Sequence, residues 1–194
     1  APLSSIRGAA ELLAENPPEP DRGRFIANLR AESERLQLIV DRLLDLAALE
    51  SRRAGSAITE VDLAGALREV HDAALAVATA RRIRISLEAP AVLHVRGERF
   101  LLVQSMSNLV QNALEFTPPG GAVVLALRAE GARAVITVAD SGSGVPDYAL
   151  DKIFDRFYSL PRPDTGRKSS GLGLSIVREI ARLTGKAPGT LLRE

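Results

Sequence analysis

The sequence has 194 residues, with 25 Lys and Arg against 24 Asp and Glu, and it contains no cysteine. The lack of cysteine excludes disulfides, thiolate zinc sites and thiol nucleophiles, and the net charge of +1 argues against a non-specific nucleic-acid binder, which needs a basic excess. Hydrophobic residues make up 46% of the chain and no uncharged apolar run approaches the length of a membrane span, so the composition indicates a globular protein.

Residues 1–55 predict two helices joined by a proline-rich turn. The apolar residues of the first helix lie three or four positions apart, on one helical face: Leu3, Ile6, Ala10 and Leu13. Pro17 and the prolines after it end this helix, and a second helix is expected over residues 21–51. Its apolar residues follow a heptad seam: Phe25, Leu29, Leu36, Ile39, Leu43 and Leu46. A hairpin has too little core to stand alone, so it packs either on its own chain or on a second copy as a four-helix bundle; the seam favours the homodimer.

After a linker at residues 51–59 the pattern changes to a mixture of helices and strands. Helices are expected over residues 62–80, 98–115, 146–157 and 172–183, and strands over 83–87, 92–95, 123–127 and 134–138. The last two strands flank Glu130-Gly131, which predicts a hairpin, and residues 160–170 are expected to form a mobile polar loop.

Two asparagines of the helix expected over 98–115 form the first candidate site. Asn108 and Asn112 lie four residues apart and therefore share a helical face. Their amide oxygens suit a hard cation such as Mg²⁺, which takes oxygen ligands and keeps several waters beside substrate phosphates. An asparagine pair is more often part of a solvated helix surface, so the pair alone decides nothing.

Two glycine-containing segments are further candidates for ligand binding. Asp140, Gly142 and Gly144 follow the strand expected over 134–138, where glycine lets the backbone approach a flat ligand. A fixed carboxylate there can accept a hydrogen bond from an amino group such as that of adenine. Residues Ser169–Leu174 lead into the last helix, whose free N–H groups and positive dipole end can cradle a phosphate. Each segment also fits an ordinary turn or helix cap.

The order and spacing of these segments resemble the histidine kinases of two-component signalling, within the wider family of ATPases that includes gyrase and Hsp90. In this comparison Asn108–Asn112 corresponds to the N box, Asp140–Gly144 to the G1 box, Phe154–Phe157 to the F box and Ser169–Leu174 to the G2 box. Residues 1–8 resemble the stretch just after the phospho-acceptor histidine of the H box. The resemblance covers nearly the whole chain.

The resemblance implies an α+β protein with two domains. The first, over residues 1–55, is a helical-hairpin dimerisation and phosphotransfer domain that forms a four-helix bundle in the dimer. The second, over residues 56–194, is an α/β-sandwich ATP-binding domain of the gyrase/Hsp90/histidine-kinase type. Segments 146–150, 157–162 and 167–174 are similar to those of Cre-type sensor kinases.

The activity that the resemblance implies is that of an ATP-dependent protein-histidine kinase. Such a kinase phosphorylates a histidine of the hairpin and passes the phosphoryl group to an aspartate of a response regulator. The resemblance also implies the cytoplasmic portion of a bacterial inner-membrane sensor, with membrane contact only through regions upstream and with no nucleic-acid partner.

The ligands implied by the resemblance are ATP and Mg²⁺. Asp140 would read the adenine amino group and Phe116 would lie against the ring, while Asn112, with Asn108 beside it, would hold Mg²⁺ against the phosphates. The residues implied to bind the nucleotide lie in or next to the N, G1 and G2 boxes: Asn108, Asn112, Phe116, Asp140, Gly142, Gly144, Lys168, Ser170, Gly171, Leu172, Gly173 and Leu174.

The loop over 160–170 matches the family in its position, but two residues in or near it differ from the family pattern. The resemblance implies that the loop acts as a lid from which Lys168 or Arg162 can reach phosphate oxygens. Glu115 stands where many relatives carry a basic residue near the phosphates, and a carboxylate cannot pair with them. Ser169 replaces a common glycine of the G2 box.

The acceptor histidine itself is expected four positions before Ala1. The two histidines present, His71 and His94, fall in the expected helix 62–80 and strand 92–95. The sequence is therefore expected to be a fragment that binds ATP and does not autophosphorylate as it stands. Ala1 occupies a position where Thr or Asn often assists dephosphorylation of the partner, and the tail over 185–194 is shorter than the two closing strands that the family implies.

Two alternatives stay open at this point. A degenerate kinase could serve as a docking scaffold that binds nucleotide and regulator without transfer, as Glu115 and Ser169 allow. A serine-directed anti-sigma kinase of the same superfamily is the other, although the H-box remnant and the heptad hairpin argue against it.

Overall fold

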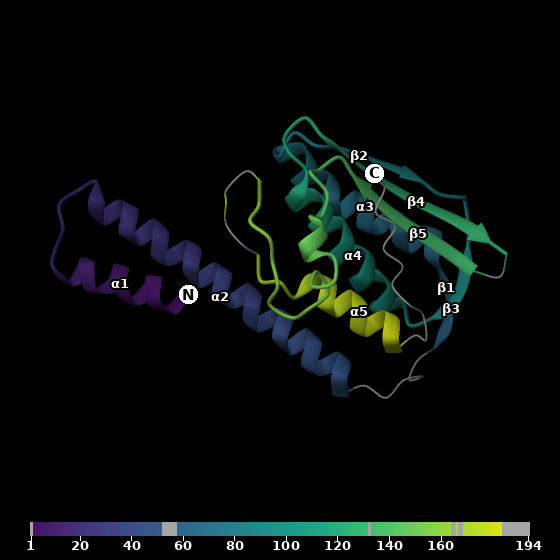
Figure 1. The fold of residues 1–194 in the computed structure, drawn as a ribbon, viewed down its shortest axis with the longest axis horizontal. Helices are drawn as coiled ribbons and strands as arrows, with labels where there is room; N and C mark the ends of the chain where they lie inside the picture. The colour runs from purple at the N-terminus through teal and green to yellow at the C-terminus, as the bar shows by residue number, and fades with distance from the viewer. Residues whose placement is uncertain (1, 52–57, 132, 164–165, 167–168, 184–194) are drawn as a thin grey trace. The chain divides into compact units, whose positions relative to one another are not determined.

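The chain divides into two compact units, Ala1–Ala48 and Leu49–Glu194. The computed structural model describes residues 2–51, 58–131, 133–163, 166 and 169–183. The first unit is a helical hairpin, and the second is a layered unit of helices and strands (Figure 1).

The hairpin consists of α1 (Pro2–Ala14) alongside the first part of α2 (Asp21–Ser51), as Figure 1 shows. In α1 the packed face is Ile6, Ala9 and Leu13, with Ala9 buried and the other two half-buried. The hairpin by itself leaves the other two residues of the expected face uncovered, since Ala10 is exposed and Leu3 is 67% exposed. A helix turns 100° per residue, so positions 9 and 10 flank the line through Ile6 and Leu13 on opposite sides, and the hairpin buries the side that carries Ala9.

The seam predicted for α2 is confirmed in its first half. Phe25 and Leu29 are half-buried, whereas Ile26 between them is 48% exposed. The side chains of Ile39, Leu43 and Leu46 lie outside the described part of the structure.

In the described part of the second unit, five strands form two sheets. In the larger sheet β2 (Arg84–Glu88) pairs parallel with β4 (Ala122–Glu130), and β4 pairs antiparallel with β5 (Arg133–Asp140), in the order β2-β4-β5. The predicted hairpin is confirmed, with Gly131 at a φ of 59° between its strands. The smaller sheet pairs β1 (Thr59–Asp62) with β3 (His94–Gly97). Strand β1 was not predicted, because its four residues contain one apolar side chain, Val61, which is too little to show an alternating pattern.

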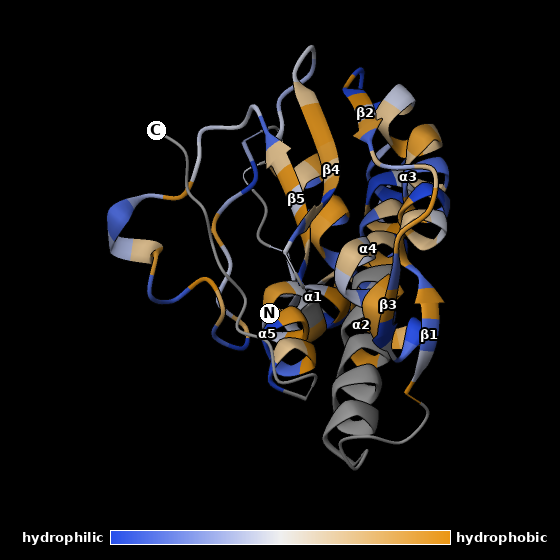
Figure 2. Ribbon diagram, turned by 90° about the vertical axis from the view of Figure 1, so that its right-hand side faces the viewer, coloured by the Kyte–Doolittle hydropathy of each residue, from blue (hydrophilic) through white to orange (hydrophobic). Residues whose placement is uncertain are grey.

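The core of the second unit lies between the larger sheet and two helices. Helices α3 (Leu63–Ala80) and α4 (Arg99–Phe116) pack on each other and cover one face of this sheet (Figures 1 and 2). Strand β4 places alternate residues in the core, as period-two geometry requires. The largest buried apolar side chains of this core are Leu63, Leu67, Val70, Ile83, Met106, Val110, Leu114, Val123, Leu125 and Leu127. The last helix, α5 (Gly173–Leu183), packs on α4.

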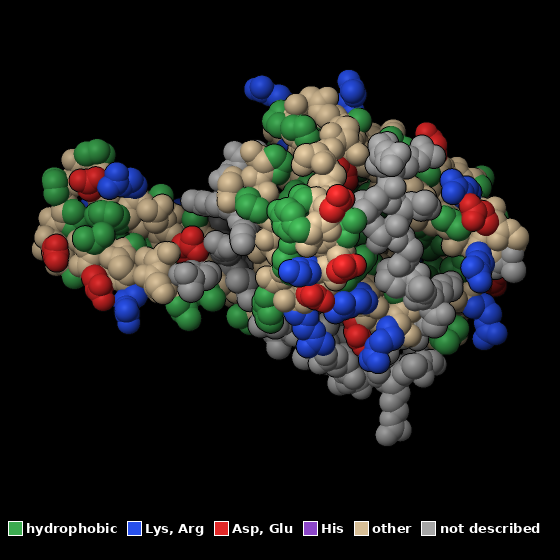
Figure 3. Space-filling model, in the orientation of Figure 1, with side chains coloured by type: hydrophobic (Ala, Val, Ile, Leu, Met, Phe, Trp, Pro, Cys, Tyr) green, Lys and Arg blue, Asp and Glu red, His purple; other side chains and the backbone are tan. Residues whose placement is uncertain are grey.

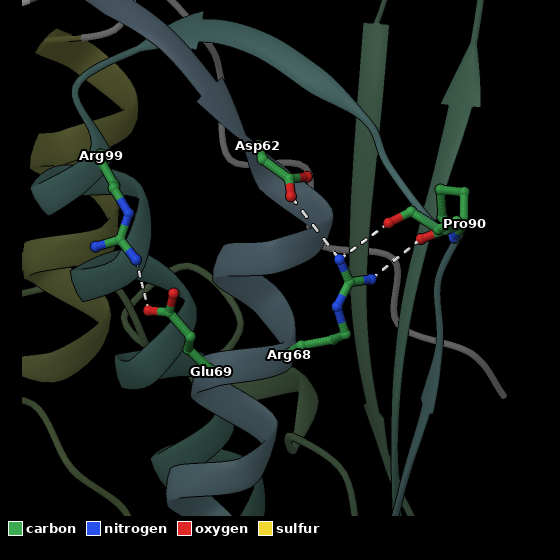
Figure 4. Close-up of polar contacts among 6 residues, drawn as sticks. Asp62, Arg68, Glu69, Pro90 and Arg99 are labelled. Atoms are coloured by element: carbon green, nitrogen blue, oxygen red, sulfur yellow. Dashed lines mark hydrogen bonds and ion pairs between the residues drawn. The ribbon is translucent and has the colours of Figure 1, made fainter.

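One arginine fixes the connection between β2 and β3 to the start of α3. Arg68 donates hydrogen bonds to the backbone carbonyls of Pro90 (3.3 Å) and Ala91 (2.9 Å), and its Nη2 lies 3.8 Å from Asp62 Oδ2 (Figure 4). The backbone N–H of Gly65 at the start of α3 is the largest cause of a lowered pKa of the Asp62 carboxyl; the Leu93 N–H and the Arg68 charge act in the same direction, and burial opposes them. The end of β1, the start of α3 and the β2–β3 connection are thereby joined at one point.

The segment that follows β5 differs from its prediction. A helix was expected over 146–157, but the structure has a single 3-10 turn at Asp147–Ala149, followed by turns. Phe157 has a φ of 65° and is 62% exposed, while Phe154 is half-buried, so the two aromatics do not share one packed face. A helix this short is marginal on its own, and tertiary contacts decide its conformation.

Charge is mixed on the face of the molecule drawn in Figure 3. On the face drawn in Figure 3, Lys and Arg side chains are interspersed with Asp and Glu instead of forming one basic area. Among the described helices, none combines the length and the apolar character needed to span a bilayer.

Candidate functional site

Helix α4 presents the two predicted asparagines on one face. Asn108 and Asn112 are both half-buried, one turn apart. The buried residues Met106, Val110 and Ala113 fix α4 in the core, which holds the two amides in place on a rigid element. Their oxygens are neutral ligands.

The C-terminal end of α4 lies against the Asp140 turn. A Cβ atom on Gly142 would lie 2.6 Å from the backbone oxygen of Phe116, so only glycine allows this close approach. The backbone N–H of Gly142 donates to Asp140 Oδ1 at 2.9 Å, which orients the exposed carboxylate at the end of β5. Ser141 ties the turn to β4, since its N–H donates to the Ala122 carbonyl and its Oγ accepts from the Ala122 N–H. The structure thus brings the predicted N-box helix and the Asp140 turn into contact.

The glycine segment before α5 packs on the segment that carries the aromatics. Gly171 has a φ of 67°, and a Cβ there would lie 2.5 Å from the carbonyl carbon of Phe157. The Phe157 N–H donates to the Gly171 carbonyl at 3.0 Å. Leu172 is fully buried and Ser175 Oγ donates to its carbonyl at 2.8 Å, so the first turn of α5 is anchored. The predicted F-box and G2-box segments are therefore in direct contact.

The N-terminus of α5 supplies the positive end of a helix dipole next to these glycines. The helix begins at Gly173, and Ser170, Gly173 and Leu174 are half-buried around this end. Backbone N–H groups of a helix start are unpaired within the helix and favour an anion. Gly144 has a φ of 72° and is exposed in the segment after Asp140. Lys168, a predicted phosphate contact, lies outside the described residues.

Two contacts of the loop after Phe157 were missed by the sequence analysis. Arg162 Nη2 lies 2.8 Å from Glu115 Oε1 on α4. Ser159 Oγ and Ser169 Oγ are 2.8 Å apart, and Ser159 Oγ also accepts from the Ser169 N–H at 3.0 Å. Glu115 and Ser169 are the two residues that depart from the family pattern. A basic residue in the loop is the natural partner for Glu115, and a hydroxyl residue is the natural partner for Ser169. Sequence spacing alone does not identify which loop residues these are.

The side chains available as ligands limit which metal ion the site could hold. The described residues contain no group of three or more His, Cys, Asp or Glu that could hold a metal ion. Two amide oxygens on one helix face fit Mg²⁺ only if phosphate oxygens and waters complete its coordination. The polar groups of the arrangement are the Asp140 carboxylate, the two amides and the N-terminus of α5, which suit a ligand that carries both hydrogen-bond donors and anionic groups.

Comparison with known families agrees with this arrangement. Residues 1–52 match the His Kinase A (phospho-acceptor) domain, and residues 97–191 match the histidine kinase-, DNA gyrase B- and HSP90-like ATPase family. The predicted α+β class, a helical hairpin followed by an ATPase-type domain, is confirmed by these matches and by the fold.

Curated relatives are sensor proteins. Over 183 residues the chain is 43% identical to the sensor protein CreC of Escherichia coli, which confirms the resemblance to Cre-type kinases. It is 33% identical over 186 residues to the sensor protein DivL of Caulobacter vibrioides. The alignments cover 94% and 95% of this chain but only 38% and 24% of those relatives, so the chain spans a minority of their length.

Solved structures of histidine kinases share the fold. The full-length histidine kinase ShkA in complex with AMPPNP superposes with a TM-score of 0.69 and 29% identity, over 95% of this chain and 38% of that one. The histidine kinase ThkA in complex with the response regulator protein TrrA gives a TM-score of 0.71 and 25% identity, over 92% and 50% of the two chains.

Proposed function

Because this chain belongs to the sensor histidine kinase family, we propose that it is the kinase core of a two-component sensor that binds Mg-ATP and phosphorylates a histidine. The observation that supports this most directly is the contact between Gly142 and the Phe116 end of α4, because it brings the adenine-reading carboxylate beside the asparagine helix. The proposed domains are the hairpin over 1–55 and the ATP-binding domain over 56–194.

Adenine recognition is proposed for Asp140. Its Oδ1 is oriented by the Gly142 N–H, and its carboxylate is exposed at the end of β5. A carboxylate accepts hydrogen bonds and donates none, so it favours the amino group of adenine over the carbonyl of guanine at the same position. Phe116 is proposed to lie against the ring.

Phosphate binding is proposed for the asparagines and the start of α5. Asn112 and Asn108 would offer amide oxygens to Mg²⁺, whose role is to neutralise charge on the phosphates. The N–H groups at Gly171, Leu172 and Gly173 would face phosphate oxygens at the positive end of α5. Phosphoryl transfer mainly requires that the phosphates are positioned and that their negative charge is stabilised. These groups, which are held by the fold, would supply both.

The partners proposed for the chain are a second copy and a response regulator. Residues 1–52 match the phospho-acceptor domain, and ThkA was solved with its response regulator. The phosphoryl group would be carried by a histidine outside this sequence, because its two histidines, His71 and His94, lie beyond residues 1–52. A cytoplasmic position in a bacterial inner-membrane sensor belongs to the same proposal.

The test uses the full-length protein with ATP labelled at the γ-phosphate. The proposal predicts protein-bound label that is stable in alkali and labile in acid, and its loss in Asp140→Asn. Asp147→Asn is the matched control, since Asp147 is exposed in the neighbouring 3-10 turn and has no proposed role.

Two results would contradict the kinase assignment. ATP binding without protein-bound label would favour the docking scaffold, and label stable in acid would favour a serine-directed kinase.

A further inference from the structure

An ion pair joins the loop after Phe157 to the last turn of α4. Arg162 Nη2 and Glu115 Oε1 are 2.8 Å apart, and the side chains are only 27% and 15% exposed. A pair this short is a charge-assisted hydrogen bond, and its burial protects it from screening by salt. Gln111 Nε2 donates to the same Glu115 oxygen at 3.2 Å, so the carboxylate is held from two sides.

Glu115 lies on the helix face that carries the asparagines. It follows Asn108 by seven residues and Asn112 by three, and positions separated by three, four and seven share one side of an α-helix. A carboxylate on the face proposed to receive phosphates would repel them unless a cation neutralises it. The proposed site therefore needs a partner for Glu115.

Arg162 is the cation that the structure places there. Its Nε is buried and has no hydrogen-bond partner among the described residues, and a guanidinium remains charged under all ordinary conditions. Burying an unpaired N–H is unfavourable, so the ion pair with Glu115 is the interaction that holds the guanidinium in this position.

The loop is also tied at its base. Ser159 and Ser169, on its two sides, are joined by the hydroxyl contact at 2.8 Å and by the Ser169 N–H. Within it the Gly166 N–H donates to the Arg162 carbonyl at 2.8 Å. Arg162 is thus fixed by its backbone and its side chain before any ligand binds.

We propose that Arg162 is a positioning residue that neutralises Glu115, so that the asparagine face of α4 can accept the polyphosphate of a nucleoside triphosphate. This inference rests on the proposed function, because it presupposes that phosphates bind at this face. Paired with Arg162, Glu115 no longer gives the end of α4 a net negative charge.

The test measures ATP dissociation constants for Arg162→Gln, Glu115→Gln and the double variant, in the otherwise unchanged chain. Arg162→Gln leaves Glu115 uncompensated, and we expect ATP to bind about tenfold more weakly because this carboxylate then repels the phosphates. The double variant removes both charges, and its affinity should return to within about threefold of wild type. The loss of affinity caused by Arg162→Gln should be largest for ATP, smaller for ADP and smallest for AMP, because the repulsion decreases as the number of phosphates falls.

The control is another ion pair near the same segment. Arg178 Nη1 lies 3.3 Å from Asp155 Oδ1, with both side chains about half exposed (47% and 55%). Arg178→Gln should leave ATP affinity unchanged. Without nucleotide, amide hydrogen exchange at Gly166 and Ser169 should be faster in Arg162→Gln than in wild type or Arg178→Gln.

Each outcome has a distinct meaning. A double variant as weak as Arg162→Gln would overturn the inference, because Arg162 would then act independently of Glu115. Unchanged amide exchange in Arg162→Gln would overturn it as well, since the ion pair would not order the loop. A wild-type chain that binds no ATP would contradict the proposed function itself, and this result is distinguishable because it does not depend on either variant.

Discussion

Two glycines with left-handed backbones differ in how closely their surroundings pack: Gly131 in the β4–β5 turn and Gly171 before α5. Gly131 and Gly171 both have positive φ, 59° and 67°, but a Cβ on Gly131 would meet nothing within 4 Å, whereas one on Gly171 would meet the backbone of Phe157 and Tyr158. Gly131→Ala therefore adds backbone strain alone, and Gly171→Ala adds strain and a steric clash.

We expect Gly131→Ala to lower the free energy of unfolding by about 1–2 kcal/mol and Gly171→Ala to lower it by about 3 kcal/mol or more. Urea unfolding of both variants measures the difference. Equal losses would show that the contact between the Gly171 and Phe157 segments relaxes freely, contrary to the packing described above.

The lowered pKa of Asp62 links stability to pH. The folded state holds its carboxyl at a lower pKa than the unfolded chain, chiefly through the Gly65 N–H. Stability from this group is therefore present above the unfolded pKa and is lost as pH falls through the folded value. In wild type the free energy of unfolding should decline below about pH 4 more steeply than in Asp62→Asn. Glu60→Gln is the control, and identical pH profiles of wild type and Asp62→Asn would refute this linkage.

At the scale of elements, the β2–β3 connection is held on α3 by a single side chain. Arg68 donates to the carbonyls of Pro90 and Ala91 (Figure 4). Both carbonyls belong to exposed residues that water can reach, so the loss on Arg68→Met should be modest, about 1–2 kcal/mol. Arg128→Met, which removes an exposed pair with Glu130, should cost less than about 0.5 kcal/mol. Thermal unfolding compares the two, and a larger loss in Arg128→Met would contradict the role given to Arg68.

The elements also show what sequence reasoning can and cannot predict. The bounds expected for α2, residues 21–51, are those observed, because a long apolar period and the prolines just before it leave few alternatives. The expected helix over 146–157 was wrong, since the positive φ of Phe157 is stabilised by its contact with Gly171, which only the folded chain brings together. The contact of Glu115 with Arg162 was missed for the same reason, whereas the asparagine pair could be predicted because its geometry is local to one helix.

At the scale of the whole molecule, the hairpin leaves apolar side chains uncovered. In this unit Leu3 is 67% exposed, Ile26 48% and Leu12 45%. The proposed homodimer would bury such residues in a four-helix bundle. Ile26→Asp should therefore shift the chain toward monomer, while Leu75→Asp, at a similarly exposed position of the second unit, should not. Sedimentation equilibrium measures both, and an unchanged mass in Ile26→Asp would count against this interface.

The central claim is that the second unit binds ATP through its Asp140 turn and asparagine helix. The most direct measurement is a titration of the chain with ATP and GTP in the presence of Mg²⁺, for wild type, Asp140→Asn and the control Asp147→Asn. Our account predicts that wild type and Asp147→Asn bind ATP at least about tenfold more tightly than GTP, as a hydrogen bond of the base to a charged acceptor implies. It also predicts that Asp140→Asn loses this preference together with most of its ATP affinity. Equal binding of ATP by wild type and Asp140→Asn, or no preference for ATP over GTP in wild type, would contradict it.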